Sequence, residues 1–307
     1  MRQFLIIPHI EVQNANALSS SLTIGFPAMT AWLGAVHALQ RHLNQDGFEL
    51  LKFSGVGVIC HDFDFHIGGD KFTSYVSASK RSPTTKREYN SFKKSNSLPL
   101  IPEGQCDLTV TLFIEYNGLS RIAEKDNLIS SMKNRMHQNM RIAGGDVIKI
   151  RDPEICNVSN EGESKKLLGK VMPGYAITER RDLMIEAMES GKDALDALLD
   201  YLAIEYTPHV EEDEGEPQKG KKKIVWTSGR KTSGWIVPIA TGFQGITPLG
   251  NVRNQRDPNT PHRFAESIIT LGEFILPTQA KSVDNILWHY RVDHEKALYL
   301  CEQEKKN

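Results

Sequence analysis

The order of strand and helix patterns in the N-terminal half restricts the fold of this 307-residue chain more than any other feature. Residues 107–116 give the clearest strand pattern, because apolar side chains alternate with other types along the stretch. Apolar, β-branched runs at 3–12, 55–65 and 146–151 predict three more strands.

Two helices are predicted between these strands. The first follows Gly25–Pro27, with Pro27 suited to the first helical position because its fixed φ matches a helix. The second spans residues 121–142 and stops at Gly144–Gly145, since glycine commonly terminates helices. Both have apolar side chains at helical spacing, namely Met29, Trp32, Leu33, Val36, Leu39 and Leu43, then Ile122, Ile129, Met132, Met136 and Met140.

Together these elements give the order βαββαβ, which predicts an α+β, ferredoxin-like (RNA-recognition-motif-like) core over residues 1–152. A long insertion at about 68–105 separates the second and third strands, where a hairpin loop has about 2–5 residues. Long insertions in compact domains are usually functional or disordered.

Residues 153–307 are expected to form a less regular α+β region that packs on this core. Its weaker patterns predict strands at 173–179 and 234–240, and helices within 181–204 and 263–276. Residues 211–223 (EEDEGEPQKGKKK) predict a charged, mobile loop.

Composition narrows the class of protein. Lys and Arg total 37 and Asp and Glu total 38, so the net charge of −1 excludes a globally basic nucleic-acid-binding protein. The four cysteines lie far apart with no C-x-x-C pair, which argues against a zinc ribbon and suits a reducing cytosol. No apolar run is long enough for a membrane span or a signal peptide, so we expect a cytoplasmic protein without a membrane partner.

Charge is nevertheless concentrated in the insertion. Between residues 71 and 94 seven basic residues face one acid, Glu88, a local charge of +6. Four aromatic residues are interleaved with Lys71, Lys80, Arg81, Lys86, Arg87, Lys93 and Lys94. Basic groups neutralise phosphates and aromatic rings stack on unpaired bases, so the segment is a candidate RNA contact. The alternative is a solvated loop whose charges only confer solubility.

A second candidate lies where the second helix meets the fourth strand. Lys133, His137 and Arg141 are four residues apart and would form one basic stripe on the helix. Gly144 and Gly145 follow, and glycine lets the backbone approach a phosphate closely. The alternative is an ordinary helix end with a solvated basic face.

The loop after the first strand is a third candidate. Asn14, Asn16, Ser19 and Ser20 carry uncharged donors and acceptors, which can read base edges or ribose hydroxyls. The same residue types also form turns and helix caps for structural reasons.

A fourth candidate is the stretch containing Arg253, Asn254, Arg256 and Arg263. Arginines among turn-forming residues can bind phosphates through their planar guanidinium groups. The alternative is a structural network with Asp257 and Glu266.

No catalytic motif stands out. Walker A, G-x-S-x-G, H-E-x-x-H and G-x-G-x-x-G patterns are absent. The best metal candidate is residues 61–66 (HDFDFH), but a metal site is not expected, nor is a cofactor or a catalytic residue. An alternative is an endoribonuclease of the same fold with His37 or His137 as general acid or base.

Several short motifs occur in a specific order over residues 5–299. They are QNANA at 13–17, GFP at 25–27, HALQR at 37–41, MRIAGG at 140–145, PGYA at 173–176, GWIVPI at 234–239, VRN at 252–254 and LGE at 271–273. In this combination the chain resembles the Cas-five-like second subunit of the type I-F CRISPR surveillance (Csy) complex, within the repeat-associated mysterious proteins.

This resemblance implies a ferredoxin-like core, a glycine-rich loop after the second helix and a thumb-like insertion. It also implies a non-catalytic subunit that holds the 5′ handle of the guide CRISPR RNA and pairs with the large subunit at one end of the complex. We therefore expect the Asn/Ser loop and the glycine-rich loop to contact the handle, and the basic insertion to be the thumb. A neighbouring backbone subunit, and target DNA near its flanking motif, are further expected partners.

Overall fold

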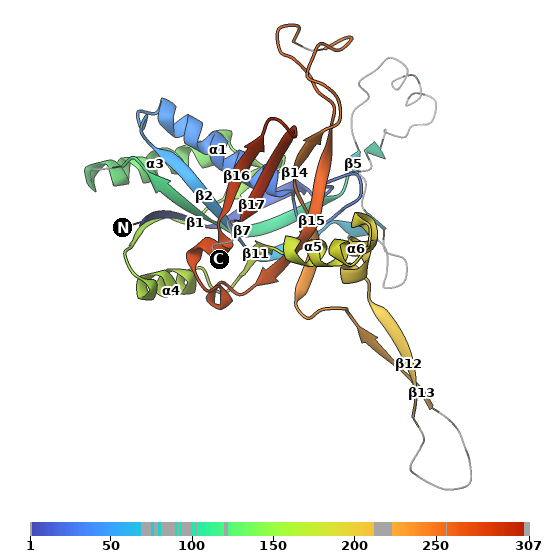
Figure 1. Ribbon diagram of the computed structural model, residues 1–307. Helices are drawn as coiled ribbons and strands as arrows, with labels where there is room; N and C mark the ends of the chain where they lie inside the picture. Colours follow the sequence, from blue (N-terminus) through green and yellow to red (C-terminus); the bar gives the residue numbers. More distant parts are fainter. Residues whose placement is uncertain are drawn as a thin grey trace.

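The computed structural model describes residues 2–68, 75–76, 79–80, 90, 93, 100–101, 103–119, 122–211, 223–255 and 257–303. Within these ranges the chain is a mixed α/β protein built on one large antiparallel sheet (Figure 1). The described strands and helices are arranged so that helices cover both faces of this sheet (Figure 1).

Four N-terminal strands form one half of the sheet. They are β1 (Arg2–Asn16), β2 (Lys52–Phe65), β7 (Gln105–Asn117) and β9 (Gly145–Lys149), in the spatial order β2-β7-β1-β9. Every neighbouring pair among them is antiparallel. The strands expected at 3–12, 55–65, 107–116 and 146–151 are therefore confirmed, with longer bounds for the first three.

Alternation along β1 divides the core into two layers. Leu5 and Ile7 pack in the cluster that includes α1 (Met29–Gln45) and α3 (Ile122–Asn139). Phe4 and Ile6 point to the other face, where α4 (Glu161–Lys170) packs. Because successive strand residues face opposite sides, one strand supplies both layers.

The helix α1 confirms the predicted apolar face. All six expected residues, Met29, Trp32, Leu33, Val36, Leu39 and Leu43, are buried. The prediction that Pro27 occupies the first helical position is wrong, because the helix begins at Met29 after Ala28. The Pro27 carbonyl instead accepts a 3.2 Å hydrogen bond from the Trp32 indole Nε1.

Five C-terminal strands extend the sheet from the β2 edge. They are β11 (Tyr175–Glu179), β14 (Trp235–Gly245), β15 (Ala265–Ile275), β16 (Trp288–Asp293) and β17 (Leu298–Gln303). The order β11-β15-β14-β17-β16-β2 closes on itself, because β11 also pairs with β2. The C-terminal half thus contains more strand than its weak patterns predict.

The predicted helix at 263–276 is wrong. Ala265–Ile275 is the strand β15, which pairs antiparallel with both β14 and β11. Its β-branched run Ile268–Thr270 suits a strand, and long-range pairing outweighs the apparent helical spacing. Gly272 of β15 packs closely against Ile239 of β14, since a Cβ on Gly272 would lie 2.9 Å from Ile239 Cδ1.

The helical region expected within 181–204 is confirmed as α5 (Arg181–Glu189) and α6 (Ala194–Leu202), which pack together on β14 and β15. A hairpin of β12 (Glu205–Glu211) and β13 (Lys223–Gly229) then projects away from the sheet (Figure 1). Most of the predicted mobile loop, residues 212–222, lies outside the described residues.

Smaller elements complete the fold. They are β3 (Ile67–Gly68), β4 (Tyr75–Val76), β5 (Ser79–Lys80), β6 (Leu100–Ile101), β8 (Arg141–Ile142), β10 (Glu154–Val158) and the 3-10 turns Pro277–Gln279 and Val283–Ile286. β3 pairs with β4 and β5 with β6, so short hairpins occur within the insertion between β2 and β7. No described helix is both long and apolar enough to cross a bilayer.

Candidate nucleic-acid interface

The end of β1 meets the turn between β8 and β9. The Asn16 N–H donates a 2.8 Å hydrogen bond to the Ala143 carbonyl, and Gln13 pairs with Asp146. We call Gln13–Asn16 together with Arg141–Asp146 the β1–β9 junction. The structure therefore brings together two of the four predicted RNA-contacting segments, which lie far apart in the sequence.

Gly144 and Gly145 do not terminate a helix, contrary to the prediction. The helix α3 ends at Asn139, and Ala143 and Gly144 are the tip of the β8–β9 hairpin, with φ of +50° and +79°. Both residues adopt the left-handed region that a tight hairpin turn requires. Gly144 is exposed, with no atom within 4 Å of the position a Cβ would take, so a ligand can reach its backbone.

Gly145 has the opposite environment. A Cβ at this residue would lie 2.6 Å from the Gln13 carbonyl oxygen and 2.8 Å from the backbone of Ala15. Only glycine allows the two strands to approach this closely. Gly145 therefore sets the junction geometry, and Gly144 presents its accessible backbone.

Asn14 occupies the other side of the junction. It lies in a register shift of β1 with φ of +56°, and its N–H donates a 2.9 Å hydrogen bond to Asp107 Oδ1. The same oxygen is 3.1 Å from His66 Nε2. Asp107 thus orients both the Asn14 backbone and the His66 ring, two contacts that the sequence did not predict.

The basic stripe predicted on the second helix is wrong. Lys133 and His137 lie on α3, but Arg141 is beyond the helix, on β8. Lys133 pairs with Asp152, whereas Arg141 is 3.1 Å from Asp146 at the junction. The Arg141 and Asp146 side chains are 71% and 60% exposed, so this ion pair is weak and leaves the guanidinium accessible.

The polar side chains of the loop after β1 are mostly engaged within the loop. Asn16 Oδ1 accepts from the Leu18 N–H at 2.9 Å, which forms a local turn. Ser20 Oγ accepts from the Thr23 N–H at 3.0 Å, and both Ser19 Oγ and Ser20 Oγ lie within 2.9 Å of Thr23 Oγ1. RNA contacts by Asn16, Ser19 and Ser20 stay a prediction that has to compete with these bonds.

The fourth predicted segment connects β14 and β15. Arg253 and Arg263 are exposed, and neither pairs with a described acid. Asp257 instead accepts from Thr260 Oγ1 at 2.5 Å and from the Asn259 N–H, which lowers the pKa of Asp257.

Asn254 lies in the same segment and has φ of +60°. Arg256, and Arg81, Lys86 and Arg87 of the insertion, lie outside the described residues.

The candidate catalytic and metal residues are dispersed. His37 on α1 and His137 on α3 are exposed and make no hydrogen bond or ion pair with a described residue. Within the described ranges, no three His, Cys, Asp or Glu side chains are grouped so as to hold a metal ion. Of the HDFDFH motif, His66 pairs with Asp107 and His61 points to a different part of the sheet.

His61 lines a hollow of about 650 Å³ beside β1 and β10. Its Nδ1–H donates to the Pro173 carbonyl at 2.5 Å, and its Nε2 accepts from the Thr111 hydroxyl at 2.6 Å. The Thr111 hydroxyl oxygen in turn accepts a 3.1 Å hydrogen bond from the backbone N–H of His9. The His9 and His61 rings stack, with their centroids 4.2 Å apart. The bond to Pro173 requires a proton on Nδ1, and burial lowers the pKa of His61, which favours the neutral ring.

A pH dependence of stability follows from these rings. Desolvation is the largest cause that lowers the pKa of both His9 and His61. Unfolded histidines then bind more protons, so the free energy of unfolding falls as pH drops below about 6.5. We expect Tm, scanned from pH 7.5 to 5.5, to fall less steeply in His61→Gln than in wild type.

The exposed His137 supplies the control. His137→Gln should reproduce the wild-type dependence of Tm on pH, because that ring is solvated in the folded protein. Equal slopes in wild type and His61→Gln would show that His61 does not carry the effect.

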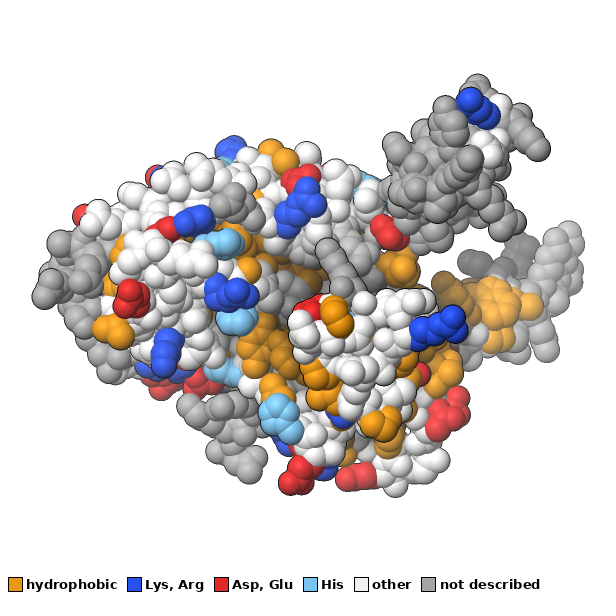
Figure 2. Space-filling model, turned by 90° about the horizontal axis from the view of Figure 1, so that it is seen from above, with side chains coloured by type: hydrophobic (Ala, Val, Ile, Leu, Met, Phe, Trp, Pro, Cys, Tyr) orange, Lys and Arg blue, Asp and Glu red, His pale blue; other side chains and the backbone are white. Residues whose placement is uncertain are grey.

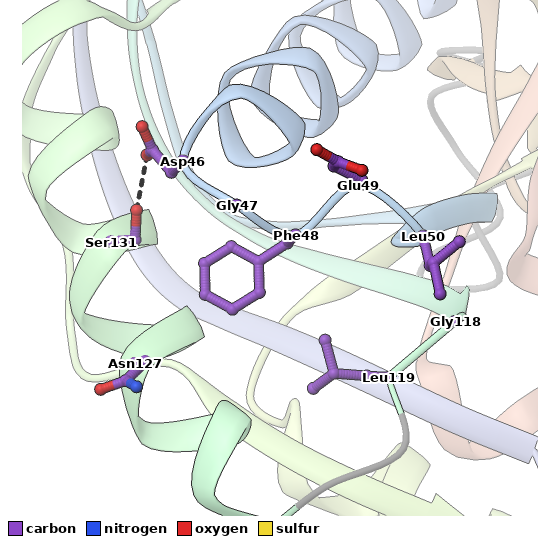
Figure 3. Close-up of a pocket in the computed structure, with 9 residues that line it drawn as sticks. All are labelled: Asp46, Gly47, Phe48, Glu49, Leu50, Gly118, Leu119, Asn127 and Ser131. Atoms are coloured by element: carbon purple, nitrogen blue, oxygen red, sulfur yellow. Dashed lines mark hydrogen bonds between the residues drawn. The ribbon is translucent and has the colours of Figure 1, made fainter.

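A second hollow, of about 660 Å³, lies between the α1–β2 loop and α3 (Figure 3). Asp46 at its edge accepts from Ser131 Oγ at 2.6 Å and from Arg135 Nε at 2.8 Å. Both bonds lower the pKa of Asp46, to about 2, and the bond from Arg135 has the larger effect. Phe48 and Leu50 line the remainder (Figure 3). Asp46 joins the end of α1 to α3, and none of the predicted RNA-contacting residues that the structure describes lines this hollow.

Comparison with known proteins connects this geometry to a family. Residues 5–301 match the family described as CRISPR-associated protein (Cas_Csy2). The chain is also 30% identical over 320 aligned positions to the CRISPR-associated protein Csy2 of Pseudomonas aeruginosa (strain UCBPP-PA14), covering 96% of this chain and 93% of that protein. Since the match extends over nearly the whole chain, the protein belongs to the Cas_Csy2 family of CRISPR-associated proteins.

Proposed function

We propose that this chain is a non-catalytic subunit of a type I-F CRISPR RNA-guided surveillance (Csy) complex in the cytoplasm. In this role it binds the 5′ handle of the guide RNA and pairs with the large subunit and a neighbouring backbone subunit. Family membership supports the assignment to CRISPR defence. The observation that carries the RNA-binding role is the β1–β9 junction, where the Asn16 N–H meets the Ala143 carbonyl.

The chemistry of the junction suits a single-stranded RNA end. Gly144 offers accessible backbone, Arg141 an exposed guanidinium, and Asn14 an exposed amide. Unpaired RNA is recognised by hydrogen bonds to base edges and ribose hydroxyls, with cations on its phosphates. Guide pairing would then read the target sequence, while the protein contacts the RNA backbone and shape.

The strand order supports the finer assignment of the fold. In chain order β1, β2, β7 and β9 are the first to fourth strands, and they lie in space as second, third, first, fourth. With α1 after the first strand and α3 after the third, this order supports a ferredoxin-like core. We propose that residues 1–152 form this core and residues 153–307 a second region packed on it, with the insertion at 68–105 as a thumb.

A filter-binding experiment tests the RNA role. The protein, purified with its large-subunit partner, should bind handle RNA better than a scrambled RNA of the same length. We expect Arg141→Ala to weaken handle binding about tenfold, the equivalent of about 1.4 kcal/mol. The loss follows from removing a charge-assisted contact to phosphate.

Lys149 offers a matched control on the same hairpin. It is also exposed, and its Nζ is 3.7 Å from Glu11, but it lies at the other end of β9 from the turn. Lys149→Ala should therefore change handle affinity less than twofold. Equal affinity for handle and scrambled RNA would contradict the proposed function.

The endoribonuclease alternative has a separate test. Purified protein is incubated with a repeat-hairpin RNA, and the products are separated on a gel. Cleavage that disappears in His37→Ala or His137→Ala would overturn the non-catalytic role. We expect the RNA to remain intact.

A further inference from the structure

The projecting hairpin β12–β13 has one apolar and one polar face. Tyr206 pairs with Ser228, and Pro208 pairs with Trp226, so these side chains share a face. Tyr206 is 65% exposed and Trp226 is 62% exposed, and Ile224 follows on the same face. Two large aromatic side chains are therefore presented to solvent on a hairpin that stands apart from the core (Figure 1).

The hairpin is fixed to the body at its base. Lys231 Nζ is 2.7 Å from Asp200 Oδ2 on α6 and lies 4.4 Å from the centroid of the Tyr201 ring. A two-stranded hairpin is marginally stable alone, and both strands of this one are edges. A held, protruding hairpin of this kind is suited to contact another molecule.

The helices α5 and α6 also expose aliphatic side chains. Leu195 and Leu199 are four residues apart on α6, on the same helix face, and are 54% and 53% exposed. Ile185 and Met188 are exposed on α5, which packs against α6. Figure 2 shows, on another view of the molecule, that hydrophobic side chains reach the surface in groups. We call α5, α6 and the β12–β13 hairpin the acidic arm, because of the charge described next.

Acidic residues dominate this stretch of sequence. From Asp182 to Glu205, which covers α6 and all of α5 except Arg181, there are seven acids and one basic residue, Lys192, a net charge of −6. Exposed carboxylates that make no ion pair with a described residue are Glu186, Glu189, Asp193, Asp196 and Glu205.

This charge argues against a nucleic acid as the occupant. Binding RNA or DNA requires cations that replace the counterions of the phosphates. Beside the hairpin, Lys192 and Lys231 both pair with Asp200, and Arg230 Nη1 donates a 3.4 Å hydrogen bond to the Ile236 carbonyl.

We propose that the acidic arm docks a protein subunit whose contacting face is apolar at its centre and basic at its rim. Exposed Trp and Tyr are typical anchors of protein interfaces, and complementary charges around them accelerate association. In the assembled complex the chain then contacts RNA at the β1–β9 junction and protein at the acidic arm. The proposal rests on the proposed function only in taking the large subunit as its probe.

Binding of the full-length chain to the purified large subunit, without guide RNA, tests the arm. Trp226→Ala should weaken binding at least tenfold, as expected for a central aromatic anchor. Trp226→Phe should retain most of the affinity, because it keeps an aromatic side chain in place. Thr227→Ala, on the opposite face of the same strand, should bind within twofold of wild type.

The acidic residues around the apolar side chains are tested separately, through the rate of association. Glu186→Lys combined with Asp196→Lys should slow association and flatten its dependence on salt, because screening acts on the same long-range attraction. These residues are exposed on helix surfaces, so the fold is expected to tolerate the change. An unchanged association rate would contradict the charge complementarity.

Two outcomes overturn the proposal. One is wild-type affinity for the large subunit in both Trp226→Ala and Tyr206→Ala. The other is photocrosslinking of the hairpin to guide RNA in the assembled complex. Failure of the RNA role is distinguishable, because Arg141→Ala should lose handle RNA while still pairing with the large subunit, and Trp226→Ala should do the reverse.

Discussion

Replacing Trp288 with alanine is expected to lower the free energy of unfolding by about 3–5 kcal/mol, the usual cost of truncating a fully buried large aromatic side chain. Trp288 is fully buried, and its indole Nε1 donates a 2.9 Å hydrogen bond to the Ile177 carbonyl on β11. It also pairs with Val56 on β2. Trp288 therefore connects β16 with β11 through its side chain and with β2 through strand pairing, where the C-terminal strands join the N-terminal sheet.

Urea unfolding at pH 7 measures this cost, and two variants separate its causes. Trp288→Phe keeps much of the volume but leaves the Ile177 carbonyl without its donor, so we expect an intermediate loss of about 1–3 kcal/mol. Trp235→Ala removes a tryptophan that is 54% exposed and should cost clearly less. If Trp288→Ala were no more destabilising than Trp235→Ala, the buried contact would not join the two halves.

The closed strand order β11-β15-β14-β17-β16-β2 connects this loss of stability to the β1–β9 junction. β2 has β7 on one side, and on its other side it contacts β16 at Val56 and β11 at Ile59 and Cys60. β7 in turn carries Asp107, which orients Asn14 at the β1–β9 junction. Loss of the C-terminal support is therefore expected to disturb the junction through β2 and β7.

Local patterns predicted the N-terminal elements because those patterns coincide with burial. Residues 107–116 alternate, and their apolar side chains are buried between two helical layers. The strand β15 was missed for the opposite reason. Its residues are almost continuously apolar or β-branched over Ile268–Leu271, and only pairing with β14 and β11 distinguishes strand from helix.

The candidate site was predicted in part for a similar reason. The sequence singled out Asn14 and Gly144 by residue type, but their φ angles and their neighbours depend on strand register. Asp107 gave no local signal, since an Asp after Cys106 is ordinary in sequence, and His66 was singled out only as part of the metal candidate HDFDFH. Arg141 was selected for a helical stripe, whereas a β-hairpin turn brings it to the junction.

Replacing Gly145 with alanine is expected to separate the two segments of the junction. The new Cβ would lie 2.6 Å from the Gln13 carbonyl oxygen and 2.8 Å from the Ala15 backbone, closer than such atoms approach. Both contacts are to backbone, so no side-chain rotation relieves them, and β9 has to move away from β1. We expect a stability loss of about 1–3 kcal/mol, typical of overpacking.

Handle binding should fall further than stability alone explains. A shift of the β8–β9 hairpin displaces Arg141 and Gly144 together, so we expect at least a tenfold loss of affinity in the filter-binding assay while the variant is still folded by circular dichroism. Gly144→Asn tests the neighbouring position, where φ is +79° and space is open. Asparagine tolerates the left-handed region, so this variant should fold like wild type.

Gly169→Ala is the matched control, because it makes the same glycine-to-alanine change at a position with open space. Gly169 lies on α4 with no atom within 4 Å of a would-be Cβ, and alanine is the better helix former, so stability should be unchanged or slightly higher. A Gly145→Ala protein with wild-type stability and wild-type handle affinity would mean that the junction tolerates separation. In that case the close approach of β1 and β9 could not be what positions the RNA, and the binding surface would have to be sought among the exposed arginines between β14 and β15.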